Sequence, residues 1–346
     1  MTSPERTILV ATVGQGILRS NDDGVSWHRL GLKEAIEFDG TVRSLAVDRR
    51  RPERVYAGAD CGFCISDDGG AHWRRAEGPL NGQSIWSIAT DPGNPDVIFA
   101  GTGAPSRAAI FRSRDAGETW MRLAPEFPEF CAGVNRPRLL TICVDPENSR
   151  DVWFGVEEGG CWRSRDGGDT WIRVDDTPGG IRSSDIHAIA VIVAREGAPK
   201  TTLVLTVNCV YRSVDNGATW TGELSRDRFG LYYTRTVLPL PSSNEAVLAI
   251  GDGTPGRYTR IYRSEDRAET WSETEFEVAP NSTVWAFGGH DSMPQLLFAG
   301  TKYGDLFRSA DAGRTWQKEW REFSEITAIA WTPVKAPLIG HAQSIQ

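Results

Sequence analysis

The sequence lacks several features that would point to common classes of protein. It has 38 Lys and Arg residues against 46 Asp and Glu residues, a formal net charge of −8, so it does not offer the basic surface that binding to bulk nucleic acid requires. No apolar run reaches the length of about 18 residues that a membrane span needs, and the first residues, Met1 to Thr7, lack the apolar segment of a secretory signal. We therefore expect a cytoplasmic protein that binds neither nucleic acid nor a membrane.

Cysteine is also sparse, and its spacing predicts no metal centre. Among the six cysteines, Cys61 and Cys64 form the only Cys-x-x-Cys pair. That spacing is typical of zinc or redox sites, but neither a second pair nor a nearby histidine completes a zinc set. The sequence therefore favours free thiols in a reducing compartment, and we predict no cofactor and no bound metal.

What the sequence does contain is one octapeptide repeated seven times. Its consensus is Ser-x-Asp-x-Gly-x-Thr-Trp, and its copies are Ser20–Trp27, Ser66–Trp73, Ser113–Trp120, Ser164–Trp171, Ser213–Trp220, Ser264–Trp271 and Ser309–Trp316. The closing tryptophans are about 45–51 residues apart, a period typical of repeat architectures. The repeat thus predicts a single domain over residues 1–333, with a C-terminal tail at 334–346, although 346 residues would ordinarily suggest two domains.

Each repeat has the pattern of four short strands. In the third repeat, the apolar runs 85–89, 97–101 and 109–112 are separated by turn-forming residues and precede the octapeptide and an outer strand. Runs of β-prone residues bounded by Gly, Pro and Asp are strand signals, and four antiparallel strands make a propeller blade. The predicted fold is all-β: a seven-bladed β-propeller of four-stranded antiparallel blades.

The two ends of the chain predict how the ring closes. Only two strands, at 8–12 and 16–19, precede the first octapeptide, so the N-terminal blade lacks its innermost strand. The segment 325–331, after the last octapeptide, has the inner-strand pattern. We expect this C-terminal strand to complete the N-terminal blade, because closure removes the exposed edges of an open array.

The octapeptide itself has a structural explanation. Its Asp can accept backbone N–H bonds within the turn, its Gly can take a positive φ, and its Trp can pack between neighbouring blades. The sixth copy has Ala268 in the Gly position, which costs about 1 kcal/mol if that position is left-handed. We expect none of the seven Asp residues to contact a ligand.

The octapeptide resembles the Asp-box, or bacterial-neuraminidase repeat, of sialidases, xyloglucan-type glycosidases, sortilin-type receptors and photosystem II assembly factors. The resemblance covers nearly the whole chain and implies the propeller fold, but these families share a scaffold and differ in chemistry. Sialidases of this kind have a six-bladed ring and an Arg-Ile-Pro element. This sequence has seven repeats and lacks that element, so sialidase activity proper is not expected. Xyloglucan-type enzymes usually pair two propellers and are exported, whereas the assembly factors resemble this chain in blade number.

Because the repeats can be aligned with one another, they show where the chain stops repeating. One inner-strand column reads Arg43, Trp86, Leu140, His187, Arg235, Trp285, Thr327. The column two residues upstream reads Thr41, Ser84, Arg138, Asp185, Tyr233, Thr283, Glu325, and the column two residues downstream is uniformly apolar: Leu45, Ile88, Ile142, Ile189, Val237, Phe287, Ile329. A pure scaffold would repeat in all three columns. The variable polar residues, which are costly to bury without partners, predict a ligand-binding mouth; the alternative is a solvated rim.

The residues of this mouth predict an anionic, ring-containing ligand. Three arginines from alternate blades, Arg43, Arg138 and Arg235, can converge on one anion, and two tryptophans, Trp86 and Trp285, can stack on a ring. Loop residues add three further substrate-binding candidates: Arg107, Glu157 and Arg257. The glycine-rich loops 101–107 and 251–257 and the insertion 125–137 can partly cover the mouth.

The same columns predict a proton-transfer site. Asp185 and His187 lie on one face of a strand, so His187 can act as a general acid or base with its tautomer set by the carboxylate. Tyr233 is the second candidate for proton transfer. The other four histidines lie elsewhere, which excludes a centre of three or four histidines, while a calcium or magnesium site made by Asp185, Glu157 and Glu158 stays open.

These residues favour a small-molecule enzyme of the hydrolase or lyase type. The alternative is a non-catalytic scaffold that binds a protein partner, like the photosystem II assembly factors, and whose arginines contact that partner.

Overall fold

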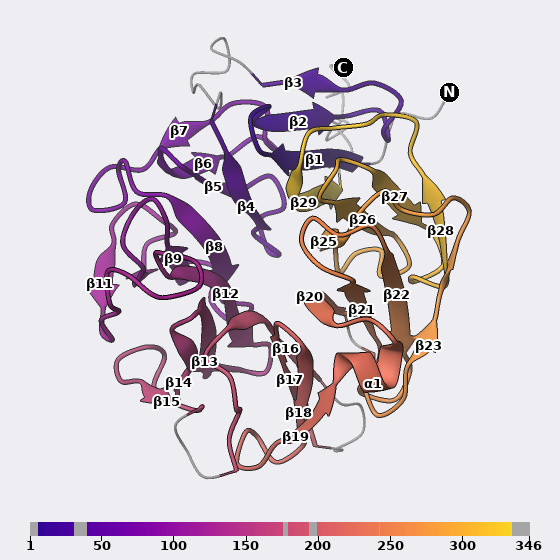
Figure 1. Ribbon diagram of the computed structural model, residues 1–346. Coiled ribbons are helices and arrows are strands. Elements are labelled where there is room, and N and C mark those ends of the chain that lie inside the picture. The colour runs from indigo at the N-terminus through magenta and orange to yellow at the C-terminus, as the bar shows by residue number, and fades with distance from the viewer. Residues whose placement is uncertain (1–5, 31–39, 176–178, 194–198, 242, 334–346) are drawn as a thin grey trace, which may run out of the picture.

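A computed structural model describes residues 6–30, 40–175, 179–193, 199–241 and 243–333. Seven β-sheets are arranged in a ring around a central axis (Figure 1). This confirms the predicted all-β, seven-bladed propeller, and the predicted tail at 334–346 lies outside the described residues.

The blades are numbered here in chain order, each from its innermost to its outermost strand. Blade 1 is β29 (Ile326–Pro333), β1 (Arg6–Thr12), β2 (Ile17–Ser20) and β3 (His28–Arg29). Blade 2 is β4 (Val42–Val47), β5 (Val55–Ala59), β6 (Gly62–Ser66) and β7 (Arg74–Arg75). Blade 3 is β8 (Ile85–Thr90), β9 (Ile98–Thr102), β10 (Ala109–Ser113) and β11 (Met121–Leu123). Blade 4 is β12 (Arg138–Asp145), β13 (Asn148–Glu157), β14 (Gly160–Ser164) and β15 (Ile172–Arg173).

The last three blades continue the same order. Blade 5 is β16 (Ile186–Ile192), β17 (Thr201–Thr206), β18 (Cys209–Ser213) and β19 (Thr221–Leu224). Blade 6 is β20 (Tyr233–Pro239), β21 (Ala246–Gly251), β22 (Thr259–Ser264) and β23 (Ser272–Glu273). Blade 7 is β25 (Val284–Gly289), β26 (Leu297–Thr301), β27 (Leu306–Ser309) and β28 (Thr315–Lys318). Two elements go beyond the prediction: β24 (Glu275–Phe276), which pairs parallel to β28, and the short helix α1 (Ser225–Phe229).

The N-terminal blade closes as predicted. β29 pairs antiparallel with β1 from Arg6 opposite Pro333 to Thr12 opposite Ile326. The first and last strands of the described chain therefore lie side by side near the top of Figure 1. Closure leaves no inner strand unpaired in the ring, which removes the edges of an open array.

The hydrophobic core is divided into seven clusters, and each cluster joins two neighbouring blades. Trp120, for example, packs with Tyr56 and Phe63 of blade 2 and with Ile98 of blade 3. Every octapeptide tryptophan belongs to or packs against one such cluster. Burying a side chain of this size stabilises a blade interface by a few kcal/mol, so the repeated tryptophan has the inter-blade role that its sequence position predicts.

The octapeptide turn is held by its own side chains. Ser113 Oγ donates to Asp115 Oδ1 at 2.8 Å and accepts the Gly117 N–H at 2.8 Å, while Asp115 Oδ1 also accepts the Thr119 N–H at 2.8 Å. Gly117 has a φ of 92°, and Ala268, at the same place in the sixth copy, has a φ of 61°. Ala268 is thus left-handed, the condition under which an alanine at this position costs about 1 kcal/mol.

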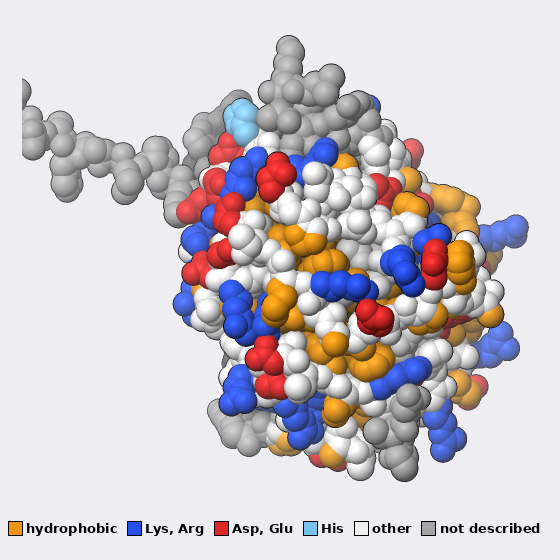
Figure 2. Space-filling view, turned by 90° about the vertical axis from the view of Figure 1, so that its left-hand side faces the viewer, with side chains coloured by type: hydrophobic (Ala, Val, Ile, Leu, Met, Phe, Trp, Pro, Cys, Tyr) orange, Lys and Arg blue, Asp and Glu red, His pale blue; other side chains and the backbone are white. Residues whose placement is uncertain are grey.

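The outer side of the ring carries charges of both signs next to one another. Figure 2 shows acidic and basic side chains interspersed on the side of the ring that lies at the left in Figure 1. Some of them link blades: Arg54 of blade 2 lies 3.1 Å from Glu118 of blade 3, and Arg112 of blade 3 lies 2.7 Å from Asp169 of blade 4. Within the described residues, no helix has the length and apolar character needed to cross a membrane.

Candidate functional site at the propeller mouth

Every inner strand carries a β-bulge at the same position. In blade 2, Val42 pairs with Ala59 and Ser44 with Gly58, so Arg43 has no partner in the ladder. The seven bulged residues are Arg43, Trp86, Leu140, His187, Arg235, Trp285 and Thr327. They form the same column that the sequence alignment singles out. Because a bulge frees a residue from the ladder and re-aims its side chain, each blade presents one side chain at the mouth.

Arg43 is held in place by its own blade and by blade 3. Its Nε donates to Asp60 Oδ1 at 2.8 Å and to Ser84 Oγ at 3.2 Å. Its guanidinium carbon also lies 3.9 Å from the ring centroid of Trp86, and the Trp86 indole N–H donates to the Ala104 carbonyl at 2.8 Å. Arg43 is therefore a fixed positive charge whose carboxylate partner is already present.

Arg138 is paired in a similar way. Its Nη1 lies 2.9 Å from Glu157 Oε2, and its guanidinium carbon lies 5.1 Å from the Trp86 ring centroid. Two arginines therefore lie over the Trp86 ring, where cation–π contacts stabilise them. The indole face that the sequence assigns to a substrate ring is engaged by guanidinium groups.

Arg235 differs from the other mouth arginines. Its guanidinium carbon lies 3.6 Å from the centroid of the Trp285 ring, its Nε is buried without a hydrogen-bond partner, and burial lowers its pKa. Lys302 Nζ lies 4.0 Å from the same ring and also pairs with Glu325, and burial likewise lowers the pKa of Lys302. Within the described ranges, Arg235 makes no ion pair, so its charge is available to a ligand.

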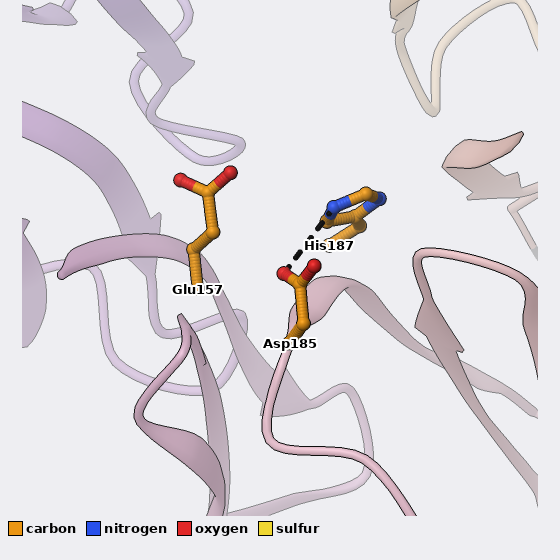
Figure 3. Close-up of side chains that lie close together, drawn as sticks. All are labelled: Glu157, Asp185 and His187. Atoms are coloured by element: carbon orange, nitrogen blue, oxygen red, sulfur yellow. Dashed lines mark ion pairs between the residues drawn. The ribbon is translucent and has the colours of Figure 1, made fainter. Parts of the chain in front are cut away.

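Glu157, Asp185 and His187 form the most concentrated group of titratable side chains at the mouth. One ligand atom from each lies within 4.8 Å of the others, and Figure 3 shows the three side chains around a common gap. Glu157 ends β13, Asp185 precedes β16, and His187 is the bulged residue of β16. Adjacent blades therefore supply the group.

A backbone carbonyl fixes the tautomer of His187. His187 is only 4 % exposed, and its Nδ1 lies 2.7 Å from the Thr234 carbonyl oxygen. A carbonyl can only accept, so Nδ1 carries a hydrogen and Nε2 faces Asp185 Oδ1 at 3.4 Å. The Thr234 carbonyl therefore sets the tautomer, and the Asp185 carboxylate does not, contrary to the prediction from the sequence.

Tyr233 closes one side of this group. It is buried, its ring centroid lies 5.1 Å from that of His187, and its ring stacks on Trp285 at 6.5 Å. Burial raises its pKa. The phenol therefore remains protonated at neutral pH, which favours a hydrogen-bond donor over a nucleophile.

A hollow of about 530 Å³ opens beside Trp86. It is lined by Arg43, Trp86, Ala104, Pro105, Val134, Asn135, Arg136 and Arg138. Two segments that the sequence predicts as covers, the loop 101–107 and the insertion 125–137, therefore form part of its wall. The insertion is tied to blade 4 by the Gly133 N–H, which donates to Glu158 Oε2 at 2.8 Å.

The remaining predicted loop residues lie outside the group. Arg107 has a mostly exposed side chain, and its closest carboxylate is that of Glu129 at 4.0 Å. Arg257 is exposed, and only its backbone N–H is held, by Asp252 Oδ1 at 2.8 Å. Glu158 contacts Gly133, as above, and does not join Glu157 and Asp185 among the described contacts. The Thr234 carbonyl was not predicted as a site group, because a backbone acceptor leaves no signal in residue type.

The other end of the channel has a different character. A cavity of about 550 Å³ there is bordered by inner strands of all seven blades and includes Leu45, Ile88, Ile142, Ile189, Phe287 and Ile329. These residues belong to the uniformly apolar column of the inner strands. They do pack against the inter-blade clusters, and their remaining surface faces the channel. The same cavity is also bordered by Arg49, Glu147, His290 and Asp291, which follow the ends of inner strands.

Comparisons with known proteins reveal relatives among polysaccharide-degrading enzymes. No family model matches the chain. A xyloglucanase from Paenibacillus sp is 28 % identical over 336 residues, which cover 81 % of this chain and 31 % of the relative. The xyloglucanase Xgh74A from Acetivibrio thermocellus is 26 % identical over 328 residues, which cover 81 % of this chain and 38 % of the relative. The chain thus spans less than two fifths of the length of these two relatives.

Solved structures show the same propeller fold. The GH74 xyloglucanase from Xanthomonas campestris superposes with a TM-score of 0.63 at 22 % identity, covering 80 % of this chain and 45 % of that protein. YCF48 from Cyanidioschyzon merolae superposes with a TM-score of 0.53 at 15 % identity, covering 81 % and 84 %. At these identities the likeness extends to the fold, and function has to be argued from the site.

Proposed function

We propose that this protein is a hydrolase that binds an anionic, ring-containing molecule at the propeller mouth, and that the molecule is a sugar bearing a carboxylate. Arg235 anchors the carboxylate. The group formed by Glu157, Asp185 and His187 activates the water that attacks the neighbouring bond. Three features support the proposal: an arginine without an ion-pair partner, a buried histidine of fixed tautomer, and relatives that are xyloglucanases.

The single observation that carries the proposal is Arg235. A half-buried guanidinium without an acidic partner is costly to maintain, and here the Trp285 ring compensates only part of that cost through its cation–π contact. A substrate carboxylate would supply the missing partner with the paired geometry that guanidinium favours. Arg43 and Arg138 already have carboxylate partners, so they shape the mouth and leave Arg235 to bind the anion.

The water-activating group lies beside this anchor. The three donor atoms are separated by no more than 4.8 Å, so one water placed between them can contact all three. In the tautomer that Thr234 fixes, the Nε2 of a neutral His187 ring can take the proton of that water, and the carboxylates stabilise the imidazolium that forms. Tyr233, kept protonated by burial, can donate a hydrogen bond to the leaving oxygen.

The place of action is part of the proposal. All six cysteines are free thiols, which supports a reducing, cytoplasmic compartment. A cytoplasmic hydrolase would act on oligosaccharides that have already been imported and shortened.

Binding of a saccharide panel tests the anion anchor. We expect acidic oligosaccharides that contain a uronic acid to bind the purified protein in isothermal titration calorimetry, and neutral xyloglucan oligosaccharides to bind more weakly. Arg235→Met should weaken binding of the acidic ligands about 10- to 150-fold, because a hydrogen bond to a charged group contributes about 1.5–3 kcal/mol. The matched control is Arg260→Met, which removes an arginine paired with Glu273 on the rim and should leave binding unchanged.

Two results would overturn the proposal. One is the absence of any preference for acidic saccharides, and the other is an Arg235→Met variant that binds them as well as the unaltered protein. Capture of a co-purifying protein that is lost on changing Arg43 and Arg235 would instead favour the scaffold alternative. For any saccharide that is cleaved, incorporation of ¹⁸O from labelled water identifies hydrolysis, whereas an unsaturated product without ¹⁸O identifies a lyase.

A further inference from the structure

We propose that Glu157, Asp185 and His187 form a binding site for a divalent transition-metal ion. This inference rests on the proposed function in so far as the ion would occupy the water-activating group of the same site. The ion would then replace His187 Nε2 as the group that activates the water, because a nitrogen bound to a metal has no lone pair to accept a proton. The inference does not depend on the identity of the substrate.

The hydrogen bond from His187 Nδ1 to the Thr234 carbonyl prepares the ring to bind a metal. It leaves the lone pair of the neutral ring on Nε2, and it fixes the orientation of that lone pair. Metal-binding histidines almost always donate their other ring N–H in this way, to a carbonyl or a carboxylate. His187 is also nine-tenths buried, so water has little access to Nε2 except through the gap shared with the two carboxylates.

Asp185 faces this nitrogen without satisfying it. The distance from His187 Nε2 to Asp185 Oδ1 is 3.4 Å, longer than the 2.7–2.9 Å typical of a charge-assisted N–H···O hydrogen bond. Asp185 Oδ1 is buried and has no hydrogen-bond partner. A buried acceptor opposite a second acceptor is unfavourable, and a cation between them would remove that cost.

Glu157 supplies the third donor from the neighbouring blade. Its Oε2 accepts from Arg138 Nη1 at 2.9 Å, which orients the carboxylate and leaves Oε1 for a ligand. A single ion between donors that all lie within 4.8 Å of one another can contact each of them. Three protein ligands would leave coordination positions for water and substrate, as in catalytic metal sites.

The donor set selects the class of ion. One imidazole nitrogen and two carboxylate oxygens suit Mn²⁺, Fe²⁺, Co²⁺ or Zn²⁺, whereas Ca²⁺ takes six to eight oxygen ligands. Such an ion lowers the pKa of a bound water and so supplies a nucleophile at neutral pH. The protein would contribute the open site, the Arg138 contact that orients Glu157, and Arg235 as the nearby anchor of the substrate.

Titration with Mn²⁺ tests the site in the full-length protein without any substrate. After treatment with a chelator, the protein should bind one equivalent of Mn²⁺, measured by loss of the free-ion signal in electron paramagnetic resonance. Mn²⁺ is chosen because cysteine sulfur, such as that of Cys61, prefers softer metals. Asp185→Asn and His187→Gln should each weaken binding by about tenfold or more, since loss of even an outer-shell partner typically costs about 10–100-fold in metal affinity.

Glu158→Gln is the matched control, because Glu158 neighbours Glu157 in sequence but accepts a hydrogen bond from Gly133. It should bind Mn²⁺ like the unaltered protein. Absence of a one-equivalent site, or binding that survives both Asp185→Asn and His187→Gln, would refute the metal site. Saccharide cleavage that persists after complete metal removal contradicts the role of the ion in activating the water and leaves the proposed function intact. Mn²⁺ binding without any saccharide binding supports the metal site and refutes the function.

Discussion

The turn of the fifth octapeptide allows backbone strain and steric crowding to be measured separately. Gly217 has a φ of 76°, in the left-handed region, and a Cβ added there would meet the ring of Trp153 at 2.5 Å and Arg163 Nη1 at 3.3 Å. Gly14 has a similar φ of 86°, but a Cβ added there would have no atom within 4 Å. Alanine should therefore cause similar backbone strain at both positions, but steric overlap only at position 217.

The expected magnitudes follow from these environments. An alanine in the left-handed region costs about 1–2 kcal/mol, and the lower entropy of the unfolded chain returns about 0.4–1 kcal/mol. Gly14→Ala should therefore lower the free energy of unfolding by about 1 kcal/mol or less. Gly217→Ala adds the overpacking of Trp153, which typically costs about 1–3 kcal/mol, so we expect a total loss of about 2–4 kcal/mol.

The measurement is urea-induced unfolding followed by circular dichroism and tryptophan fluorescence. Equal destabilisation by the two substitutions would show that the close contact between a Cβ at position 217 and Trp153 has no cost, and the steric argument would fail. Ala268→Gly provides an internal check at the one copy with a natural alanine. Relief of strain there is offset by chain entropy and by lost burial of a methyl group worth about 0.8 kcal/mol, so stability should change little.

Three further predictions concern acid, thiol chemistry and a buried ion pair. The hydroxyl of Thr219 lowers the pKa of Asp215 to about 2. Because this pKa is lower in the folded than in the unfolded protein, ionised Asp215 stabilises the fold above the unfolded pKa of about 4, and that contribution is lost as the pH falls towards 2. Asp215→Ala should therefore make the melting temperature less sensitive to pH between about 4 and 2. A hydrogen bond from the Cys64 thiol is the main cause that lowers the pKa of Cys61 to about 6; its alkylation by iodoacetamide should rise with a midpoint near that pH, and Cys64→Ser should move the midpoint. Asp151→Ala should cost about 3–5 kcal/mol of unfolding free energy in chemical denaturation, because it strands Arg163, whose side chain is 2 % exposed; a loss below 1 kcal/mol would show that this pair is not needed.

The sequence predicts the scaffold well because the sequence pattern of a blade occurs seven times. The octapeptide copies give the number of blades, and the segment 325–331 gives the closing strand, which the structure places at Ile326–Pro333. Both depend on hydrophobic patterns and turn chemistry, which are local properties of the chain. The column of mouth residues follows from the same repetition, and in the structure its members are the bulged residues of the inner strands.

The side-chain contacts within the mouth could not be predicted in the same way. Arg43 and Arg235 occupy equivalent positions, yet Arg43 contacts Asp60 while Arg235 has no ion pair within the described residues. Such differences depend on how each loop places its side chains, and residue type alone does not give that placement. The Thr234 carbonyl that holds His187 is a backbone group, and its position cannot be predicted from residue types.

The regular bulge of the inner strands has a consequence for how such a protein can evolve. The bulged residue is outside the hydrogen-bonded ladder, so its replacement disturbs neither strand pairing nor the clusters between blades. The ring therefore has seven positions at which a substitution can change ligand binding while the scaffold is preserved. In this chain those positions hold two arginines, two tryptophans, a histidine, a leucine and a threonine, and selection can change them one blade at a time.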